Sequence, residues 1–554
     1  MSSLGFADRF ERLVDPGTED ELAFNHPLVM LLEAVLAPKR GAELERTGTF
    51  PRAELEKAAQ LGLFALVSPA CAGGSLGWSR AMRPALRISA HDLDFALVLG
   101  GSILTGVAVL TAGSESQQIM YFRSLQNGDM SALALSEWGH GSDLLGNETY
   151  ARPDAGHWKN WQKAAIYGEK APINNGSQGA YVVVLARTGK ENDPFGQSLF
   201  LVPQGSKNLR RERPFDLIGF RCLDLARISF DGTEVTPENL LGELHEGFSY
   251  ARRTLEVTRS GVACVAAGAL AKSVWLALDH AHTRRLYNAP IAELAAVRGL
   301  VARAVARLAL AMALVRMTVR IIDCSPAAAP MWTSASKWLV PMLLEHTIRD
   351  AGMVIGARSL LEDFPFARLR RSAPLLGIFD GSAQLQLDEL ARHVARWPLD
   401  SPCPLNPDTA WKYLLEMGPL PFDANRQVDS ATIASFTPTH AGVVAAESSR
   451  AIGALARSLV PIATSRRAHI ETRHRVSECG AWLVAATAFS WMRHRSPELS
   501  VCEPLVFDEI DRGIHSSLRA LGIRDELSPC PGTELDSATN RVFDWITAVR
   551  SDLT

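Results

Sequence analysis

The order of secondary-structure signals along the chain constrains its fold more than any other feature. Residues 22–127 repeat apolar side chains at helical spacing. After Gly128 the chain has short runs rich in β-branched residues, such as Tyr181–Ala186, bounded by Gly, Asn and Asp turns. Helical periodicity returns from Glu246 to Arg396, with apolar residues around most of each turn, as the helices of a central bundle require. This order predicts an α+β protein with a small β-domain between two helical domains.

The domain boundaries follow from changes in this pattern along the 554 residues. Residues 397–430 contain six prolines and are typical of a linker, and helical periodicity resumes after them, notably over His440–Ile470 and Arg473–Arg493. We expect strands at Ser131–Leu135, Tyr181–Ala186, Ser198–Val202 and Ile228–Phe230. The expected domains are an N-terminal helical domain (1–127), a middle β-domain (128–243), a C-terminal four-helix bundle (244–396), the Pro-rich linker (397–430) and an additional all-α domain (431–554).

The composition is that of an ordinary globular protein without a strong charge. Hydrophobic residues make up 47% of the chain and charged residues 21%, and 57 basic against 60 acidic residues leave a formal net charge of −3. These values exclude disordered and collagen-like classes and predict no broad attraction to nucleic acid or anionic lipid. Short basic runs, such as residues 210–213, lack aromatic platforms and are typical of solvated faces. We expect no nucleic-acid partner.

The most apolar windows are predicted to be buried helices rather than membrane spans. Gly261–Leu278 contains Lys272, and Leu300–Ile322 contains four arginines, which a bilayer strongly disfavours. Residues 1–20 lack the basic and apolar regions of a secretory signal. The eight cysteines are scattered, and no CxxC pair, HExxH motif or Cys/His cluster occurs. We expect a reduced, cytoplasmic protein without a metal site or an integral membrane segment.

A Gly-rich segment follows the first expected strand. It reads Ala-Leu-Ser-Glu-Trp-Gly-His-Gly-Ser-Asp over residues 134–143. A strand end followed by such a turn exposes backbone N–H groups and a hydroxyl with little side-chain bulk in the way, which suits contact with the polar edge of a ring cofactor. The segment resembles the A-x-T-E-P-x-x-G-S-D signature of the acyl-CoA dehydrogenase flavoprotein family.

Three further motifs and the domain order extend this resemblance over residues 25–396. Residues 168–176 are similar to the family's G-x-K-x-W-I-T-N, residues 284–291 to R-x-x-F-G-x-P-I, and residues 371–386 to R-D-A-x-x-x-x-I-Y-E-G-T-x-Q-I-Q. The resemblance implies the family's three-domain fold and an FAD cofactor. Residues 400–554 lie outside it and look like the extra C-terminal helical domain that some larger members carry.

The resemblance also implies which residues contact the cofactor. Leu135 and Ser136 are implied at the pyrimidine edge of the flavin and Asn174 near its N5. Arg284 is implied at the pyrophosphate of the FAD of a neighbouring subunit, a role that suits the fixed fork of a guanidinium. The implied cofactor-binding residues are Leu135, Ser136, Gly141, Ser142, Asn174, Arg284, Tyr287, Ser382 and Gln384. The implied substrate-binding residues are Ser142, Arg259 and Gly381.

The chain departs from the family pattern at several of these positions. Pro172 replaces a Trp that packs against the flavin, and Ala295 and Met353 replace two Gln that help to hold the cofactor. Asp380 stands where most members have the catalytic Glu. Together these departures indicate a specialised, biosynthetic member rather than a housekeeping β-oxidation enzyme.

Asp380 is the candidate catalytic base. In most family members the residue at this position removes the α-proton of an acyl thioester while flavin N5 accepts the β-hydride, and burial raises the pKa of such a base. Some branches place the base immediately before the Arg of a core helix, which we expect at Arg259–Leu270, but that position is Thr258. An Asp before Gly-Ser-Ala can also cap the following helix, so a capping role stays open.

The resemblance therefore implies an FAD-dependent dehydrogenase that forms an α,β-double bond in an acyl thioester carried by CoA or a carrier protein. It also implies an electron acceptor such as an electron-transfer flavoprotein or oxygen, and a homo-oligomer, with a dimer favoured. Two alternatives stay open. One is a flavin-dependent oxidase or monooxygenase on the same fold, and the other is a non-enzymatic relative that serves in assembly.

Overall fold

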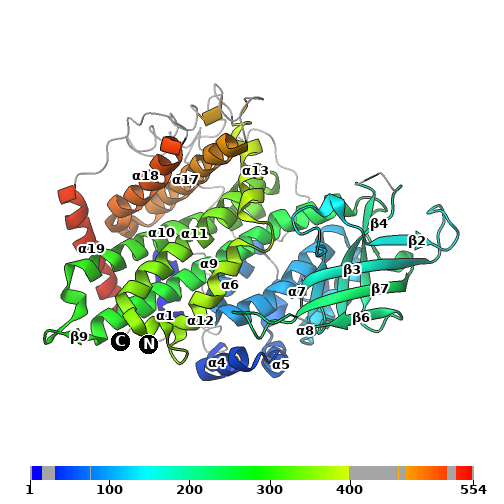
Figure 1. Ribbon diagram of the computed structural model, residues 1–554, viewed down its shortest axis with the longest axis horizontal. Helices are drawn as coiled ribbons and strands as arrows, with labels where there is room; N and C mark the ends of the chain where they lie inside the picture. Colours follow the sequence, from blue (N-terminus) through cyan, green and yellow to red (C-terminus); the bar gives the residue numbers. More distant parts are fainter. Residues whose placement is uncertain are drawn as a thin grey trace.

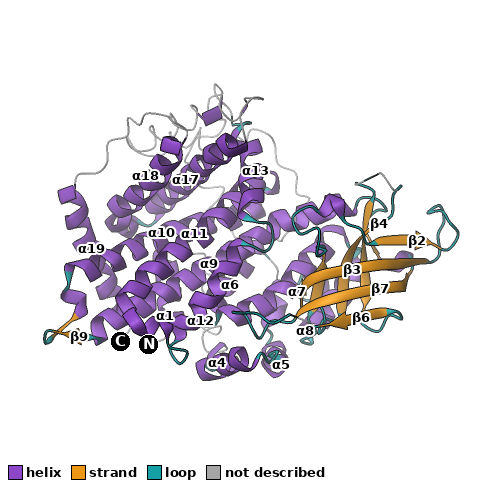
Figure 2. Cartoon of the chain, in the orientation of Figure 1, coloured by secondary structure: helices purple, strands orange, loops and turns teal. Residues whose placement is uncertain are grey.

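The structure is a computed structural model that describes residues 3–14, 32–74, 77–190, 193, 195–213, 215–397, 459–460, 464, 470–520 and 532–551. The expected Pro-rich linker beyond Trp397 and most of the expected helix His440–Ile470 lie outside these residues. A large helical body carries a β-sheet at one end (Figures 1 and 2).

The helices that precede the sheet begin where the sequence carries helix-start signals. Asp92 caps α7 by accepting a hydrogen bond from the Phe95 N–H at 3.0 Å, and Ser114 and Gln117 form a capping box on α8. Pro51 directly precedes α5, a position where proline favours a helix start. The helices of this part are α1 (Ser3–Val14), α4 (Pro38–Thr47), α5 (Arg52–Gln60), α6 (Trp78–His91), α7 (Leu93–Ala112) and α8 (Glu115–Gln126).

An eight-stranded sheet follows α8. Its strands run in the order β6-β7-β3-β2-β4-β5-β8, and β1 pairs in parallel with β4. The four expected strands are confirmed as β1, β4, β5 and β7, whereas β2, β3, β6 and β8 were not expected. In β3 the residues Gly168, Glu169, Lys170 and Pro172 are all uncommon in strands. The strands are β1 (Ser131–Ala134), β2 (Tyr150–Pro153), β3 (Ala164–Asn174), β4 (Tyr181–Arg187), β5 (Gln197–Pro203), β6 (Leu209–Glu212), β7 (Leu225–Val235) and β8 (Leu240–Leu241).

Long helices form the body of the molecule. α9 (Gly247–Thr283), α10 (Ala295–Cys324) and α11 (Ala329–Ile355) pack against one another, and α13 (Ala383–Val394) packs on α11. α12 (Pro365–Ser372) and two short 3-10 segments, one before and one after it, connect α11 to α13. The expected helix start at Arg259 is wrong, because Arg259 lies well inside α9. The first turns of α9 carry exposed Arg252 and Arg253, which weaken the apolar pattern there.

Within the part of the chain that the structure describes, two helices, α7 and α9, are long and apolar enough to cross a membrane by length and composition. In the structure 72% and 83% of their most apolar windows are buried inside the protein. The apolar windows Gly261–Leu278 and Leu300–Ile322 lie in α9 and α10, as the buried helices that the sequence predicts. Gly268 allows α9 to approach α6 closely, because a Cβ at this position would overlap the Leu86 carbonyl.

Three helices near the C-terminus cover one side of the bundle (Figure 1). α17 (Ile470–Arg495) packs on α10, α11 and α13, and both α18 (Glu503–Ala520) and α19 (Gly532–Ser551) pack on α10. Buried Arg307 of α10 joins Asp350 of α11 at 2.7 Å to Glu509 of α18 at 2.8 Å. The expected extra helical region is confirmed, and buried ion pairs attach it directly to the bundle.

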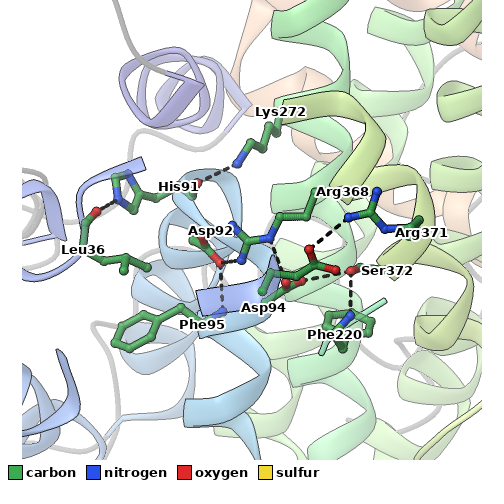
Figure 3. A network of polar contacts seen from close by, with 11 residues as sticks. Leu36, His91, Asp92, Asp94, Phe95, Phe220, Lys272, Arg368, Arg371 and Ser372 are labelled. Carbon is green, nitrogen blue, oxygen red and sulfur yellow. Dashed lines mark hydrogen bonds and ion pairs between the residues drawn. The ribbon is translucent and has the colours of Figure 1, made fainter. Parts of the chain in front are cut away.

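A polar network fixes the N-terminal helices to the bundle (Figure 3). Arg368 of α12 contacts Asp92 at 2.6 Å and Asp94 at 2.8 Å, both at the start of α7. Ser372 donates to Asp94 at 3.0 Å and accepts from the Phe220 N–H at 3.2 Å. Because Ser372 immediately precedes the segment that leads to α13, this network anchors one end of that segment.

Candidate active site

The candidate base lies in the loop between α12 and α13. Asp380 has a φ of +57° and Gly381 a φ of +90°, so two successive residues adopt left-handed backbone. A Cβ at position 381 would overlap the Gln386 side chain, so this position requires glycine. The half-buried Asp380 side chain faces α9, where the Thr258 hydroxyl donates to its two carboxylate oxygens at 3.0 and 3.2 Å.

Two buried cations lie near this carboxylate. Burial raises the pKa of Asp380 above its ordinary value, and the charges of Arg259 and Lys337, together with the Thr258 hydrogen bond, oppose this rise. Arg259 is itself ion-paired with Glu389 of α13. The resemblance implies that Arg259 binds the substrate, and the structure places its charge near Asp380. A carboxylate with a raised pKa beside fixed positive charges suits a proton acceptor.

The capping role left open for Asp380 belongs to another residue. Ser382 is the N-cap of α13, and its hydroxyl accepts a hydrogen bond from the Leu385 N–H at 3.4 Å. Asp380 instead bonds to a different helix, so the capping interpretation is wrong. Ser382, which the resemblance places at the cofactor, thus has a structural contact of its own, and Gln384 is exposed on the first turn of α13.

The two expected flavin motifs lie together beside the sheet. Lys170 of β3 donates to the Leu135 carbonyl at 2.9 Å and to the Glu137 carboxylate at 2.8 Å, and the Ala171 N–H donates to the Ser136 carbonyl at 3.2 Å. Glu137 also accepts two backbone N–H groups. Burial lowers the pKa of Lys170 to about 8, although Glu137 opposes this shift. These contacts fix the backbone of the Gly-rich turn relative to β3.

The residues around this turn fit a flavin. The Asn174 Oδ1 atom is buried without a hydrogen-bond partner among the described residues, while its amide nitrogen donates to a carbonyl of α7 at 3.1 Å. A Cβ placed on Gly139 or Gly141 would meet no other part of the described chain within 4 Å. The hydroxyls of Ser136 and Ser142 make no hydrogen bond within that part either. An unpaired acceptor, two hydroxyls and an open backbone form a set that can contact the polar edge of a flavin.

Arg284 and Tyr287 lie far from Asp380. Arg284 follows Thr258 by 26 residues, and α9 spans all but the last of them, which at a helical rise of 1.5 Å per residue corresponds to roughly 39 Å. Both residues are exposed, Tyr287 by 90%, next to the short hairpin of β9 (Arg285–Leu286) and β10 (Ala289–Pro290). This hairpin lies at the end of the bundle farthest from the sheet (Figure 1). Arg284 and Asp380 of one chain therefore do not share a site.

Met353, at a position where the family has Gln, lines an open groove of about 490 Å³ together with Glu345, Arg349 and Arg370. Its side chain is 64% exposed. Ala295 is exposed at the start of α10. Neither residue offers the amide that the family pattern places there.

Family models match three consecutive parts of the chain. The acyl-CoA dehydrogenase N-terminal domain matches residues 18–129, the middle domain residues 132–233, and the C-terminal domain residues 245–395. The chain belongs to the acyl-CoA dehydrogenase family. The protein is accordingly an FAD-dependent oxidoreductase that acts on CH–CH bonds, with the family's three-domain fold and an added helical region.

The chain is similar in sequence to an acyl-CoA dehydrogenase and a reductase, and in structure to a second acyl-CoA dehydrogenase. The chain is 29% identical over 363 residues to the mitochondrial short-chain specific acyl-CoA dehydrogenase of Mus musculus, which covers 64% of this chain and 85% of the relative. It is 27% identical over 358 residues to a 3-(aryl)acrylate reductase of Clostridium sporogenes, covering 64% of this chain and 93% of the relative. An acyl-CoA dehydrogenase from Bacillus anthracis, solved in complex with FAD, has the same fold with a TM-score of 0.73 and 17% identity, over 98% of this chain and 94% of that one.

The structure adds residues that the sequence did not single out. Lys337 and Glu389 come from α11 and α13, and they contact the Asp380 loop and Arg259 respectively. Lys337 is the one charged residue in the first four turns of α11, among apolar and small side chains, which is a signal for a buried functional or structural cation. Glu389 gives no comparable signal, because it lies among polar residues on a short amphipathic helix.

Proposed function

We propose that the protein dehydrogenates an acyl thioester between its α- and β-carbons and that Asp380 is the base. One observation carries this proposal: a carboxylate with a raised pKa occupies the position of the family's usual base, faces the hydroxyl of Thr258 and lies near two buried cations. Among the described residues we find no second carboxylate in either place where the family positions its base. The fit of the Gly-rich turn to a flavin supports the same chemistry.

The proposed reaction removes two hydrogens from neighbouring carbons. Asp380 takes the α-proton onto a carboxylate oxygen as the α-carbon–hydrogen bond breaks, and FAD, when bound, supplies the acceptor for the hydride that leaves the β-carbon. The raised pKa of Asp380 makes it a better proton acceptor than an ordinary aspartate. Thr258 donates to the carboxylate and thereby orients it, which matters because Asp is shorter than Glu by one methylene.

The proposal extends to carrier, acceptor and assembly. The acyl group is carried by CoA or a carrier protein, and the electrons leave to an electron-transfer flavoprotein or to oxygen. The departures at Pro172, Ala295, Met353 and Asp380 support a specialised, biosynthetic role. The distance between Arg284 and Asp380 supports a homodimer in which each site receives Arg284 from the partner copy.

An anaerobic bleaching screen tests this function. Purified holoenzyme is mixed with a panel of acyl-CoA and acyl-carrier thioesters, and loss of the oxidised flavin absorbance is followed. We expect one class of thioester to bleach the flavin of the wild type. The same thioester should bleach the flavin of Asp380→Asn at least about a hundredfold more slowly. The matched control is Asp388→Asn on α13, whose carboxylate contacts His474 at 2.9 Å, and which should bleach like the wild type.

Other outcomes contradict parts of the proposal. If Asp380→Asn bleaches as fast as the wild type, Asp380 is not the base. Aerobic release of hydrogen peroxide, or an oxygenated product, identifies an oxidase or monooxygenase instead. A colourless protein that binds no added FAD identifies an assembly protein. Because one relative is named a reductase, the screen also offers α,β-unsaturated thioesters to the reduced enzyme.

A further inference from the structure

Lys337 is a buried cation whose hydrogen bonds go only to backbone carbonyls. Its side chain on α11 is 1% exposed. Its Nζ donates to the Leu376 carbonyl at 2.9 Å and to the Gly381 carbonyl at 3.3 Å, and it lies 5.7 Å from the centre of the Phe379 ring. Within the described chain it forms no ion pair with a carboxylate. Burying an ammonium in this way is unfavourable, so its presence needs a reason.

The two carbonyls that Lys337 contacts flank Asp380. One precedes Asp380 by four residues and the other follows it directly, so a single ammonium joins both ends of the loop. Within this loop Asp380 and Gly381 both have positive φ, a backbone state that a non-glycine residue keeps only when its surroundings impose it. Contacts to both ends of the loop impose that state.

The charge of Lys337 acts on the same residue. Its positive charge stabilises the ionised form of Asp380, and burial lowers the pKa of Lys337 itself to about 8 while Asp380 opposes that shift. The other charged group that faces Lys337 is Arg259 of α9, which Glu389 of α13 neutralises. A charged donor bonds the two carbonyls more strongly than a neutral donor would, and the same charge also acts on Asp380.

We propose that Lys337 is a positioning residue for the base: it holds the loop Leu376–Gly381 in the conformation that presents the Asp380 carboxylate, and its charge keeps that carboxylate ionised. This inference rests on the proposed function of Asp380. It assigns to α11 a part in proton abstraction, although no atom of Lys337 needs to touch the substrate.

The test measures proton abstraction without dehydrogenation. A thioester with sulfur in place of its β-carbon has an acidic α C–H bond but no β-hydride. Holoenzyme in D₂O therefore exchanges its α-proton for deuterium without net oxidation, and NMR follows the exchange across a pH series. For Lys337→Met we expect an exchange rate about 10- to 100-fold below wild type, because the carboxylate is displaced. We also expect the acid limb of the pH profile to move to higher pH, because the nearby cation is gone.

Lys272→Met is the matched control. Lys272 of α9 is half-buried, and its Nζ also donates to a backbone carbonyl, that of His91 at 2.7 Å. The two variants lose the same kind of contact, but the hydrogen bond of Lys272 goes to His91 at the end of α6 and neither to Ser372 nor to the loop that carries Asp380. Lys272→Met should have a lowered thermal midpoint, with the exchange rate and the acid limb of the wild type.

The outcomes separate this inference from the proposed function. Asp380→Asn with undiminished exchange contradicts the proposed base. If Asp380→Asn does not exchange the α-proton while Lys337→Met keeps the wild-type exchange rate and acid limb, only the role of Lys337 is overturned. If Lys337→Met does not accumulate with bound flavin, Lys337→Gln replaces it. The Gln amide keeps a donor without the charge, so an unshifted acid limb in that variant overturns the inference as well.

Discussion

A carboxylate one methylene shorter than glutamate depends on its neighbours to bring it into position, and the contacts of Asp380 show which neighbours do so. The left-handed backbone at Asp380 and Gly381 turns the side chain toward α9, and the Thr258 hydroxyl donates to both oxygens. In some branches of the family the base itself stands at the position of Thr258. Here the residue at that position instead donates a hydrogen bond to Asp380, the base that we propose, which comes from a different segment.

Removing the Thr258 hydroxyl should change the pH dependence of the reaction. The hydrogen bond favours ionised Asp380, so Thr258→Val should raise the pKa of Asp380 further. A base acts in its deprotonated form, so the acid limb of kcat/KM should move to higher pH by about one unit, the equivalent of one hydrogen bond. Steady-state rates with the substrate found by bleaching, measured across pH, check this.

Two further variants serve as controls for that measurement. Thr258→Ser keeps a hydroxyl and should keep the wild-type limb. Thr254→Val, one turn earlier on α9, removes a hydroxyl that donates to the carbonyl of Tyr250 at 2.8 Å, and it should leave the limb in place. A limb that moves equally in Thr254→Val would attribute the effect to α9 as a whole rather than to the contact with Asp380.

The sequence identified the candidate base that we propose, but not its surroundings. Asp380 could be found because it stands inside a motif with a fixed order of residues. Thr258, Lys337 and Glu389, the last through its ion pair with Arg259, come from three different helices, and their contacts depend on how those helices pack. The capping interpretation failed for a local reason: the left-handed turn places Ser382, and not Asp380, at the start of α13.

Among the elements, glycines mark where helices approach most closely. Gly513 of α18 faces Trp482 of α17, whose ring is 3% exposed, and a Cβ at position 513 would overlap that ring. Gly299 of α10 is also helical, but a Cβ there would meet nothing within 4 Å in the described chain. Close packing therefore requires glycine at position 513 but not at position 299.

Alanine at these two positions should have opposite effects on stability. Gly513→Ala forces α18 away from α17 and should destabilise the protein by about 1–3 kcal/mol. Gly299→Ala should stabilise it by about 0.5–1 kcal/mol, because alanine loses less backbone entropy in a helix. Thermal midpoints of the holoenzymes and limited proteolysis of the C-terminal helices check both changes. A stable Gly513→Ala would contradict the packing of α17 on α18.

Periodicity predicted the elements where one face or the whole surface is apolar, and missed them where polar residues intervene. The apolar windows in α9 and α10 and the four expected strands were identified correctly. β3 was not predicted because its motif residues, including Lys170 and Pro172, are poor strand formers. Pairing with β2 on one side and β7 on the other holds them in the strand. The start of α9 was not predicted because its exposed first turns carry Arg252 and Arg253, which interrupt the apolar pattern.

At the scale of the whole molecule, the length of α9 separates two groups that the resemblance assigns to one site. Thr258 and Asp380 lie along its first half, and Arg284 follows its last residue. The C-terminal helices α17, α18 and α19 cover another side of the bundle and leave the hairpin of β9 and β10 exposed. This hairpin is therefore free to reach a second copy of the chain.

Hybrid dimers test whether each site takes Arg284 from the partner copy. A chain with Arg284→Ala and a chain with Asp380→Asn should each be nearly inactive as homodimers. In the hybrid of the two, isolated through different affinity tags, one site combines the intact Asp380 of one chain with the intact Arg284 of the other. That hybrid should therefore bleach about half of its flavin at the wild-type rate, as a two-fold dimer with one intact site requires.

The reciprocal hybrid has the same substitutions in a different arrangement. It pairs a wild-type chain with a chain that carries both Arg284→Ala and Asp380→Asn, so each of its sites lacks one of the two groups and neither should bleach at the wild-type rate. If the two residues served a site within one chain, this second hybrid would keep one intact site and the first would keep none. The ratio of the two rapid bleaching amplitudes thus decides between a shared site and a self-contained one, whatever the acyl group is.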